Sequence, residues 1–101
     1  MIVYNVTTNI EASVHEDWLQ WMKTVHIPEV MRTGMFSDFR FLKVMSDDES
    51  GGFTYSIQYT CESMARYEQY TNEFAPKLRA DTIARYGDKF LAFRTLLEVV
   101  E

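Results

Sequence analysis

Apolar and polar residues alternate over the first ten positions of the chain. Between residues 2 and 10 the even-numbered positions are mainly apolar, namely Ile2, Tyr4, Val6, Thr8 and Ile10. The odd-numbered positions are mainly polar, namely Val3, Asn5, Thr7 and Asn9. A period of two, rich in β-branched residues, is typical of a strand with one face on the core. The pattern returns with an inward set of Phe53, Tyr55, Ile57 and Tyr59. We expect a strand in each of these segments.

Two further strands are predicted over residues 36–46 and 89–99. In the first, Phe39, Phe41 and Met45 share one parity, and the other parity holds Arg40, Leu42 and Val44. In the second, the odd positions are apolar at Leu91, Phe93, Leu97 and Val99, whereas the even positions mix Phe90 and Ala92 with Arg94. Residues 46–52 are acidic and end in two glycines, which is the chemistry of a hairpin loop.

A helical pattern follows the first strand. Spacings of three and four residues place one apolar stripe on a single side of a helix, made of Val14, Trp18, Trp21, Met22 and Val25. Ser13 with Glu16 is a capping-box signature at its start. Pro28 lacks an amide donor and disfavours helical geometry before it. The helix is therefore expected to end or kink near His26, and a last turn can resume through Val30 and Met31.

A second helix is predicted after the third strand. Ser63 can cap it, and its apolar side carries Met64, Tyr67, Phe74 and Leu78. Pro76 interrupts the pattern and is best placed in the first turn of a fresh helical segment. Gly87 stands where a glycine commonly ends a helix.

This order of elements is βαββαβ, which predicts an α+β fold. Right-handed crossovers then give a ferredoxin-like sandwich, with two helices on one face of a four-stranded antiparallel sheet. The open face would show Leu42 and Val44 beside Asn5, Ser56 and Gln58. A surface that is half apolar and half polar suits a sheet-to-sheet dimer or a ligand lining.

Composition narrows the picture to one domain spanning residues 1–101. The chain is 47% hydrophobic and 15% aromatic, and so small a monomer leaves some of that apolar surface for a partner subunit or a ligand. The net charge of −5 and the lack of a basic stripe argue against nucleic acid and anionic membranes as partners. The acidic run Asp47-Asp48-Glu49 reads most simply as a solvated loop tip, and a calcium site there lacks the EF-hand spacing.

Location can be predicted from cysteine usage and from the first residues. Cys61 is the single cysteine, which excludes an internal disulfide and fits a reducing compartment. Residues 1–10 read as a strand and not as a signal peptide, and no apolar run approaches the roughly 20 residues of a membrane span. We expect a soluble, cytoplasmic protein.

His26 is the best candidate for chemistry. At about 100° per residue it lies on the shoulder of the apolar stripe, where a neutral imidazole could take a proton or orient a substrate. Alternatively, it caps the last carbonyls before Pro28 or bonds to a loop. Topology puts Cys61 at the same end of the domain, where it could be an activated thiolate or simply a small apolar core residue. His15 reads as a solvated surface residue.

The polar sheet face offers a second constellation. Asn5, Gln58 and Arg94 could converge there, with Arg40 nearby. Arg94 would bind an anionic ligand group or, more simply, a carboxylate across a subunit interface. Trp18 and Trp21 read as core, although one indole could floor a pocket. No metal-ligand spacing, phosphate-binding glycine loop or dinucleotide fingerprint occurs, so neither a metal nor a cofactor is predicted.

The segment from Trp18 to Glu29 resembles the aromatic-x-x-x-x-His-x-Pro stretch on the first helix of many dimeric α/β-barrel proteins. That superfamily includes small monooxygenase-like and ethyl-tert-butyl-ether-degradation-like proteins. The chain also resembles, almost over its full length, a family of short bacterial proteins described as a domain of unknown function, through Met1 to Asn9, Trp18 to Met31, Gln58 to Tyr70, and Ala75 through Gly87 to Leu97. The resemblance implies two ferredoxin-like protomers that close their sheets into a barrel, often around a small-molecule cavity. It does not imply one chemistry.

The resulting functional hypothesis is a homodimeric α/β barrel that binds a small apolar or aromatic molecule. Its ligand-binding residues would be Trp18, Met22, Tyr59 and Arg94. One alternative is a cofactor-independent enzyme, monooxygenase-like or isomerase-like, that uses His26 as acid and base. Another is a non-catalytic structural or regulatory module.

Overall fold

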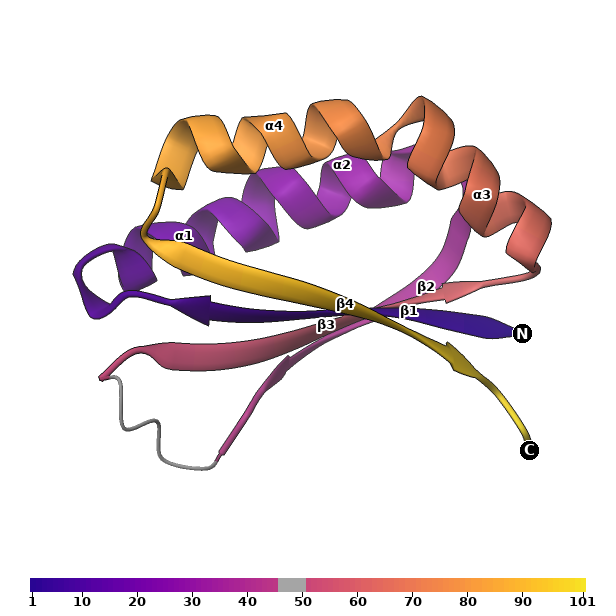
Figure 1. Cartoon of the computed structure of the whole chain (residues 1–101), viewed down its shortest axis with the longest axis horizontal. Coiled ribbons are helices and arrows are strands. Elements are labelled where there is room, and N and C mark those ends of the chain that lie inside the picture. The colour runs from indigo at the N-terminus through magenta and orange to yellow at the C-terminus, as the bar shows by residue number, and fades with distance from the viewer. Residues whose placement is uncertain (46–50) are drawn as a thin grey trace.

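Four antiparallel strands form one sheet in the order β2-β3-β1-β4 (Figure 1). The computed structural model describes residues 1–45 and 51–101 of the chain, so the acidic run Asp47-Asp48-Glu49 lies outside the described residues. The strands are β1 (Ile2–Ile10), β2 (Phe36–Lys43), β3 (Phe53–Cys61) and β4 (Phe90–Glu98). The two central strands are β3 and β1, which leaves β2 and β4 as the edges.

The helical segments lie together on one face of this sheet (Figure 1). Between the first two strands run η1 (Ala12–Val14), α1 (His15–Trp21), the π-helical turn η2 (Met22–His26) and α2 (Ile27–Arg32). After β3 come α3 (Met64–Glu73) and α4 (Ala75–Tyr86). The chain therefore has the predicted α+β, βαββαβ ferredoxin-like fold. None of the helices in the described ranges is both long and apolar enough to cross a membrane.

Three predicted helix boundaries are confirmed. Ser63 accepts a hydrogen bond from the backbone of Arg66 and caps α3. Pro76 stands in the first turn of α4, where its missing N–H costs no intrahelical bond. Gly87 ends α4 at a φ of 60°, a backbone angle that favours glycine.

The first helix departs from the prediction at its start. Ser13 lies in η1 and Val14 is the N-cap of α1 without any side-chain cap bond, so the predicted capping box is wrong. Near Pro28 only part of the prediction is met, because an irregular turn ends at His26 and the helix continues through Val30 and Met31. At Pro28 the helix neither ends nor breaks. The N–H of Ile27 donates to the carbonyl of Met22, five residues back, and this wide turn absorbs the amide that proline cannot supply.

The core lies between the two layers and is strongly aromatic. Even-numbered residues of β1 and odd-numbered residues of β3 share one face, because Tyr4 pairs with Tyr59 and Val6 pairs with Ile57. This face meets the helices, and Tyr4, Tyr59 and Ile57 are buried there. Trp18 is 1% exposed and packs edge-on against Phe41 at 5.7 Å between ring centroids. This packing fixes the height of the helices above the sheet.

The opposite face of the sheet is uncovered. Asn5, Gln58 and Arg40 share this face, as predicted, since Asn5 pairs with Gln58 and Gln58 with Arg40. Arg94 does not share it. Arg94 pairs with Val6 and therefore lies on the helix-covered face, so its predicted place among the outer polar residues is wrong. The outer face also exposes Leu42, Val44, Leu91, Phe93 and Leu97.

Candidate functional site

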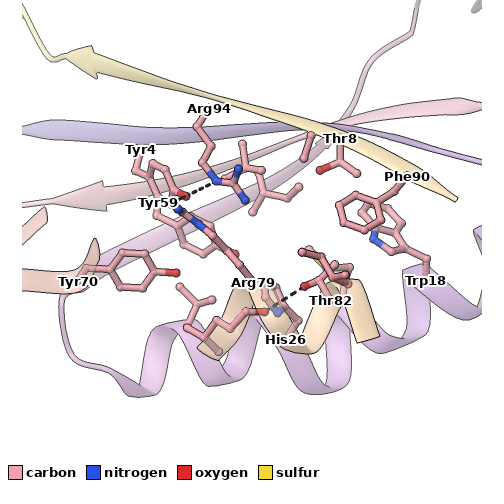
Figure 2. Close-up of a pocket in the computed structure, with 17 residues that line it drawn as sticks. Tyr4, Thr8, Trp18, His26, Tyr59, Tyr70, Arg79, Thr82, Phe90 and Arg94 are labelled. Atoms are coloured by element: carbon pink, nitrogen blue, oxygen red, sulfur yellow. Dashed lines mark hydrogen bonds between the residues drawn. The ribbon is translucent and has the colours of Figure 1, made fainter. Parts of the chain in front are cut away.

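A cavity of about 220 Å³ lies between the sheet and the helices (Figure 2). The sheet forms its roof through side chains of β1, β3 and β4, and α1, η2, α2, α3 and α4 form its floor. Most of its lining is aromatic or aliphatic, namely Tyr4, Val6, Trp18, Met22, Val30, Ile57, Tyr59, Tyr70, Leu78, Ile83, Phe90 and Ala92. The polar lining residues are Thr8, His26, Arg79, Thr82 and Arg94.

Strand register brings the sheet residues of the cavity into line. Ile57, Val6 and Arg94 form one row across three strands, because Val6 pairs with both of its neighbours. In the next row towards the end of β1, Thr8 pairs with Ala92. Ala92, on edge strand β4, contributes only a methyl group to the lining and so leaves space in the cavity. Ile83, on α4, also lines the cavity and is 59% exposed.

The π-helical turn supplies the helix side of the wall. Met22 and His26 begin and end this turn, and both line the cavity. A turn closed by a bond to the fifth residue back is wider than an α-helical turn, and such turns occur often at functional sites. The widening explains why His26, which ideal helical geometry places on the shoulder of the apolar stripe, reaches the cavity.

His26 is held in the wall by aromatic stacking. Its imidazole lies on the indole of Trp21, with ring centroids 4.9 Å apart and planes 26° apart. Burial lowers the pKa of His26 to about 4, Asp81 opposes this shift, and the positive charge of Arg94 adds to it. No hydrogen bond joins the imidazole to any residue in the described ranges. At neutral pH the ring is therefore uncharged and presents one donor and one acceptor.

One end of the cavity carries two cationic side chains, Arg79 and Arg94. Nε of Arg94, on β4, donates to the phenol oxygen of Tyr4 at 2.9 Å. Nη2 of Arg79, on α4, donates to the same oxygen at 3.4 Å. Nε of Arg79 is buried and has no hydrogen-bond partner among the residues that the structure describes. Two guanidinium groups from two different elements thus meet at one phenol (Figure 2).

Two further phenols of the lining stay protonated. Burial raises the pKa of Tyr59 and Tyr70 above the usual range, and the neighbouring tyrosines reinforce the effect. Tyr59 is 2% exposed and stacks near Tyr4 at 6.1 Å between centroids. These hydroxyls can donate a hydrogen bond to a ligand but cannot act as bases at neutral pH.

The five residues assigned to a site from the sequence lie together. His26, Trp18, Met22, Tyr59 and Arg94 all line this one cavity. Whether they bind a ligand stays a prediction.

The polar residues that α4 contributes to the cavity were missed. Arg79 and Thr82 line the cavity from α4. A helical wheel contains the signal, because residues 75, 78, 79, 82 and 86 follow one face and all except Arg79 and Thr82 are buried core residues. A guanidinium on such a face is costly without a partner, and that cost is itself a sign of a site.

The two remaining candidates, His15 and Cys61, do not line the cavity. His15 is half-buried and not a solvated surface residue, since its Nε2 lies 2.7 Å from the hydroxyl of Tyr55 and its ring stacks on Phe53 at 3.9 Å. Cys61 is fully buried, its thiol donates to the carbonyl of Ser63, and it does not line the cavity with His26. This placement fits the small apolar alternative. The described residues hold no cluster of three or more metal-ligating side chains.

Comparison with solved structures defines the class of protein. An EthD (ethyl tert-butyl ether) family protein from Bacillus halodurans superposes with a TM-score of 0.70 at 12% identity, covering 99% of this chain and 100% of that chain. A dimeric ferredoxin-like protein from an uncultured marine organism gives 0.71 at 13%, covering 100% and 96%. A mutant of MhuD with two manganese protoporphyrin IX groups bound per active site gives 0.71 at 19%, also covering 100% and 96%. Identities this low establish the fold, which is that of the dimeric α/β-barrel proteins.

The family follows from the sequence match. Residues 1–100 match the domain of unknown function DUF4286, and the chain belongs to that family. The resemblance to a domain of unknown function is thereby confirmed, and the resemblance to dimeric α/β-barrel proteins is confirmed as one of fold. No curated protein matches the chain.

Proposed function

We propose that this protein binds a small, mainly apolar or aromatic molecule in the cavity between its sheet and its helices. The convergence of Trp18, Met22, Tyr59, His26 and Arg94 on one cavity carries the proposal. Ligand sites combine an apolar lining with a few converging polar groups, and this lining has that character. An engineered apolar cavity of about 150 Å³ holds benzene, so about 220 Å³ leaves room for one substituted ring.

The cavity is smaller than the pockets that hold larger ligands. Pockets for drug-sized ligands span about 300–1,000 Å³, and this cavity falls below that range. A single ring matches this volume better than a porphyrin such as those bound to the MhuD mutant.

The direct test fills the cavity and asks whether binding disappears. Single-ring aromatic compounds would be titrated at millimolar concentration while NMR follows the indole N–H of Trp18. Ala92→Leu places a larger side chain in the cavity and should abolish the shifts. Ala84→Leu makes the same change on the exposed side of α4 and should leave them unchanged. If both variants bind alike, or if no compound shifts Trp18 in the unsubstituted protein, the cavity is not a binding site.

Catalysis by His26 is the second candidate. Its uncharged imidazole faces the cavity and has a free nitrogen lone pair. A pKa of about 4 nevertheless makes it a weak base near pH 7, where efficient proton transfer calls for a pKa close to the working pH. This value favours an orienting hydrogen bond over proton abstraction, and so favours binding over catalysis. Turnover of any bound compound that His26→Asn eliminates, while binding persists, would reverse that preference.

We also propose that two copies pair through their uncovered sheet faces. The face is partly apolar, with Phe93 63% exposed and Leu91 74% exposed. Solved relatives of the same fold include dimeric ferredoxin-like proteins. Pairing would bury these side chains and leave the cavities on the outside, between each sheet and its own helices. Native mass spectrometry reads the subunit number and any retained small molecule together, and a bare monomer would overturn the pairing. A cytoplasmic location remains the prediction made from the sequence.

A further inference from the structure

Two cationic residues at the cavity, the half-buried Arg79 and the solvent-exposed Arg94, have no carboxylate partner among the described residues. Arg79 and Arg94 both donate to Tyr4, and a phenol oxygen that accepts two hydrogen bonds does not neutralise either guanidinium. The ion pairs of the described residues involve other cations, namely Arg66, Lys77, Arg85 and Lys89. Acidic residues outnumber basic ones in the chain by 15 to 10, yet none in the described ranges forms an ion pair with these two arginines.

One guanidinium atom is also short of an acceptor. Nε of Arg79 is buried without a hydrogen-bond partner in the described part of the chain. Buried donors in native proteins are almost always paired, and an unpaired one asks for an explanation such as a missing ligand. An acceptor beside Tyr4 would serve this atom and the free N–H groups of Arg94 at once.

The lining of the rest of the cavity indicates what the uncharged part of the ligand is. Figure 2 shows Arg79, Arg94 and Tyr4 at one end, and Trp18 with Phe90 at the other. The far end has no charged lining residue, since Trp18, Met22 and Phe90 are apolar. The volume of about 220 Å³ suits one ring with a short substituent.

Building on the function proposed above, we propose that the ligand is a single-ring aromatic carboxylate, with its carboxylate between Arg79 and Arg94 and its ring towards Trp18 and Phe90. A carboxylate is planar and compact, and it matches the edge of a guanidinium group better than other organic anions of that size. The uncharged imidazole of His26 and Thr82 lie between the two ends and can meet a ring substituent (Figure 2).

The test compares benzoate with benzamide, which has nearly the same shape but no charge. NMR titration of the full chain, followed at the indole N–H of Trp18, gives both dissociation constants. We expect benzoate to bind about tenfold or more tightly than benzamide, because hydrogen bonds to charged groups are the stronger ones. Added salt should weaken benzoate and leave benzamide unchanged.

Matched variants assign the effect to the two arginines. Arg79→Gln and Arg94→Gln should each reduce the benzoate preference, and together they should remove it. Arg32→Gln takes the same charge from the exposed surface of α2, outside the cavity, and should retain the preference. The salt series on the unsubstituted protein gives an answer even if a cavity variant does not fold.

The outcomes separate the two proposals. Equal binding of benzoate and benzamide overturns the carboxylate and leaves the apolar cavity as a binding site. A benzoate preference that survives both substitutions overturns the role of Arg79 and Arg94. If neither compound shifts Trp18 at millimolar concentration, the binding function itself fails.

Discussion

The imidazole of His26 lies flat on the indole of Trp21, with ring centroids 4.9 Å apart. This stack lies at the end of η2 and holds the imidazole at the cavity wall. It also replaces water on one side of the ring, which is part of the burial that lowers the pKa of His26. One contact thus fixes both the position and the charge state of the most reactive side chain in the cavity.

The lowered pKa of His26 predicts a loss of stability in mild acid. The unfolded chain takes up a proton near pH 6.5, whereas the folded protein does so only near pH 4. Protons therefore favour the unfolded state as the pH falls through this window, and stability is fully present above it. The shift is equivalent to at most about 3 kcal/mol. Urea unfolding of His26→Gln between pH 4 and 7.5 should show a shallower pH dependence than the unsubstituted protein.

His15 provides the control for that measurement. Burial also lowers the pKa of His15, so this residue adds to the slope in the same direction. His15→Gln should therefore remove a separate and smaller part of the pH dependence. NMR titration of the two ring C–H signals would assign the pKa values directly. A His26 signal that titrates near pH 6.5 would contradict the buried, uncharged imidazole.

Adjacent residues on β4 allow a sharp test of the dimer. Phe93 pairs with Thr7 and faces outward, whereas Arg94 pairs with Val6 and faces the helices. Phe93→Lys places a charge in the middle of the uncovered face and should raise the dimer dissociation constant by about tenfold or more. Arg94→Gln should leave that constant unchanged. Sedimentation velocity over a range of concentrations measures both.

The opposite result for these two variants would assign Arg94 to the subunit interface. If Arg94→Gln weakens the dimer and Phe93→Lys does not, the subunits meet at the edge of β4, and the arginine serves the interface. If neither substitution alters the sedimentation of a dimer, the subunits pair through another surface.

Much of the fold could be predicted because the chain alternates cleanly where it forms strands. The nine residues of β1 were predicted to the residue, and Ser63, Pro76 and Gly87 marked the ends of the later helices. Local chemistry governs these features. The π-helical turn could not be predicted, since Pro28 makes ending the helix and widening it equally consistent with the sequence. Packing of Trp21 and Ile27 into the core decides between the two.

The candidate site was predictable in its members and not in its geometry. Arg94 was grouped with outer polar residues on the basis of its polarity, although its parity with Phe90 and Ala92 placed it on the inner face. His15 reads as a surface residue until strand pairing brings Phe53 and Tyr55 beside it. Arg79 was missed because a charged residue on a buried helix face looks like an exception to the apolar pattern. Arg79 and Arg94 are polar side chains at a cavity, and such residues break the rule that polar residues face water.

Tyr86 offers a test of how the two helices are held together. Its hydroxyl donates to Asp17 at 2.8 Å, joining the end of α4 to the start of α1. The Tyr86 side chain is 4% exposed and meets Trp21 edge-on. Tyr86→Phe keeps the ring packing and removes this hydrogen bond together with the one that the hydroxyl accepts from Nε of Arg85 at 3.1 Å. We therefore expect a loss of about 1–2 kcal/mol in the free energy of unfolding. Urea unfolding measures it.

The matched control for Tyr86 is an ion pair at the surface of α4. Lys77 lies 3.0 Å from Asp81 on the outside of α4, and such surface pairs contribute little. Lys77→Gln should leave the unfolding midpoint unchanged. An equal loss in the two variants would mean that α4 responds to any change in its polar contacts, and that the bond to Asp17 has no special role.

A substitution of Arg79 tests whether this residue serves ligand binding or the stability of the fold. Its buried Nε lacks a partner in the described structure, and its bond to Tyr4 is long at 3.4 Å. It also shares that phenol with a second cation, so the folded protein gains little from it. Arg79→Met keeps most of the side-chain volume and removes the unpaired group, and we expect the free energy of unfolding to rise by about 1 kcal/mol. The same variant should lose the preference for benzoate. A clear loss of stability instead, measured by urea unfolding beside Arg66→Met on α3, would show that Arg79 holds the fold together and would remove the main reason for assigning it to a ligand.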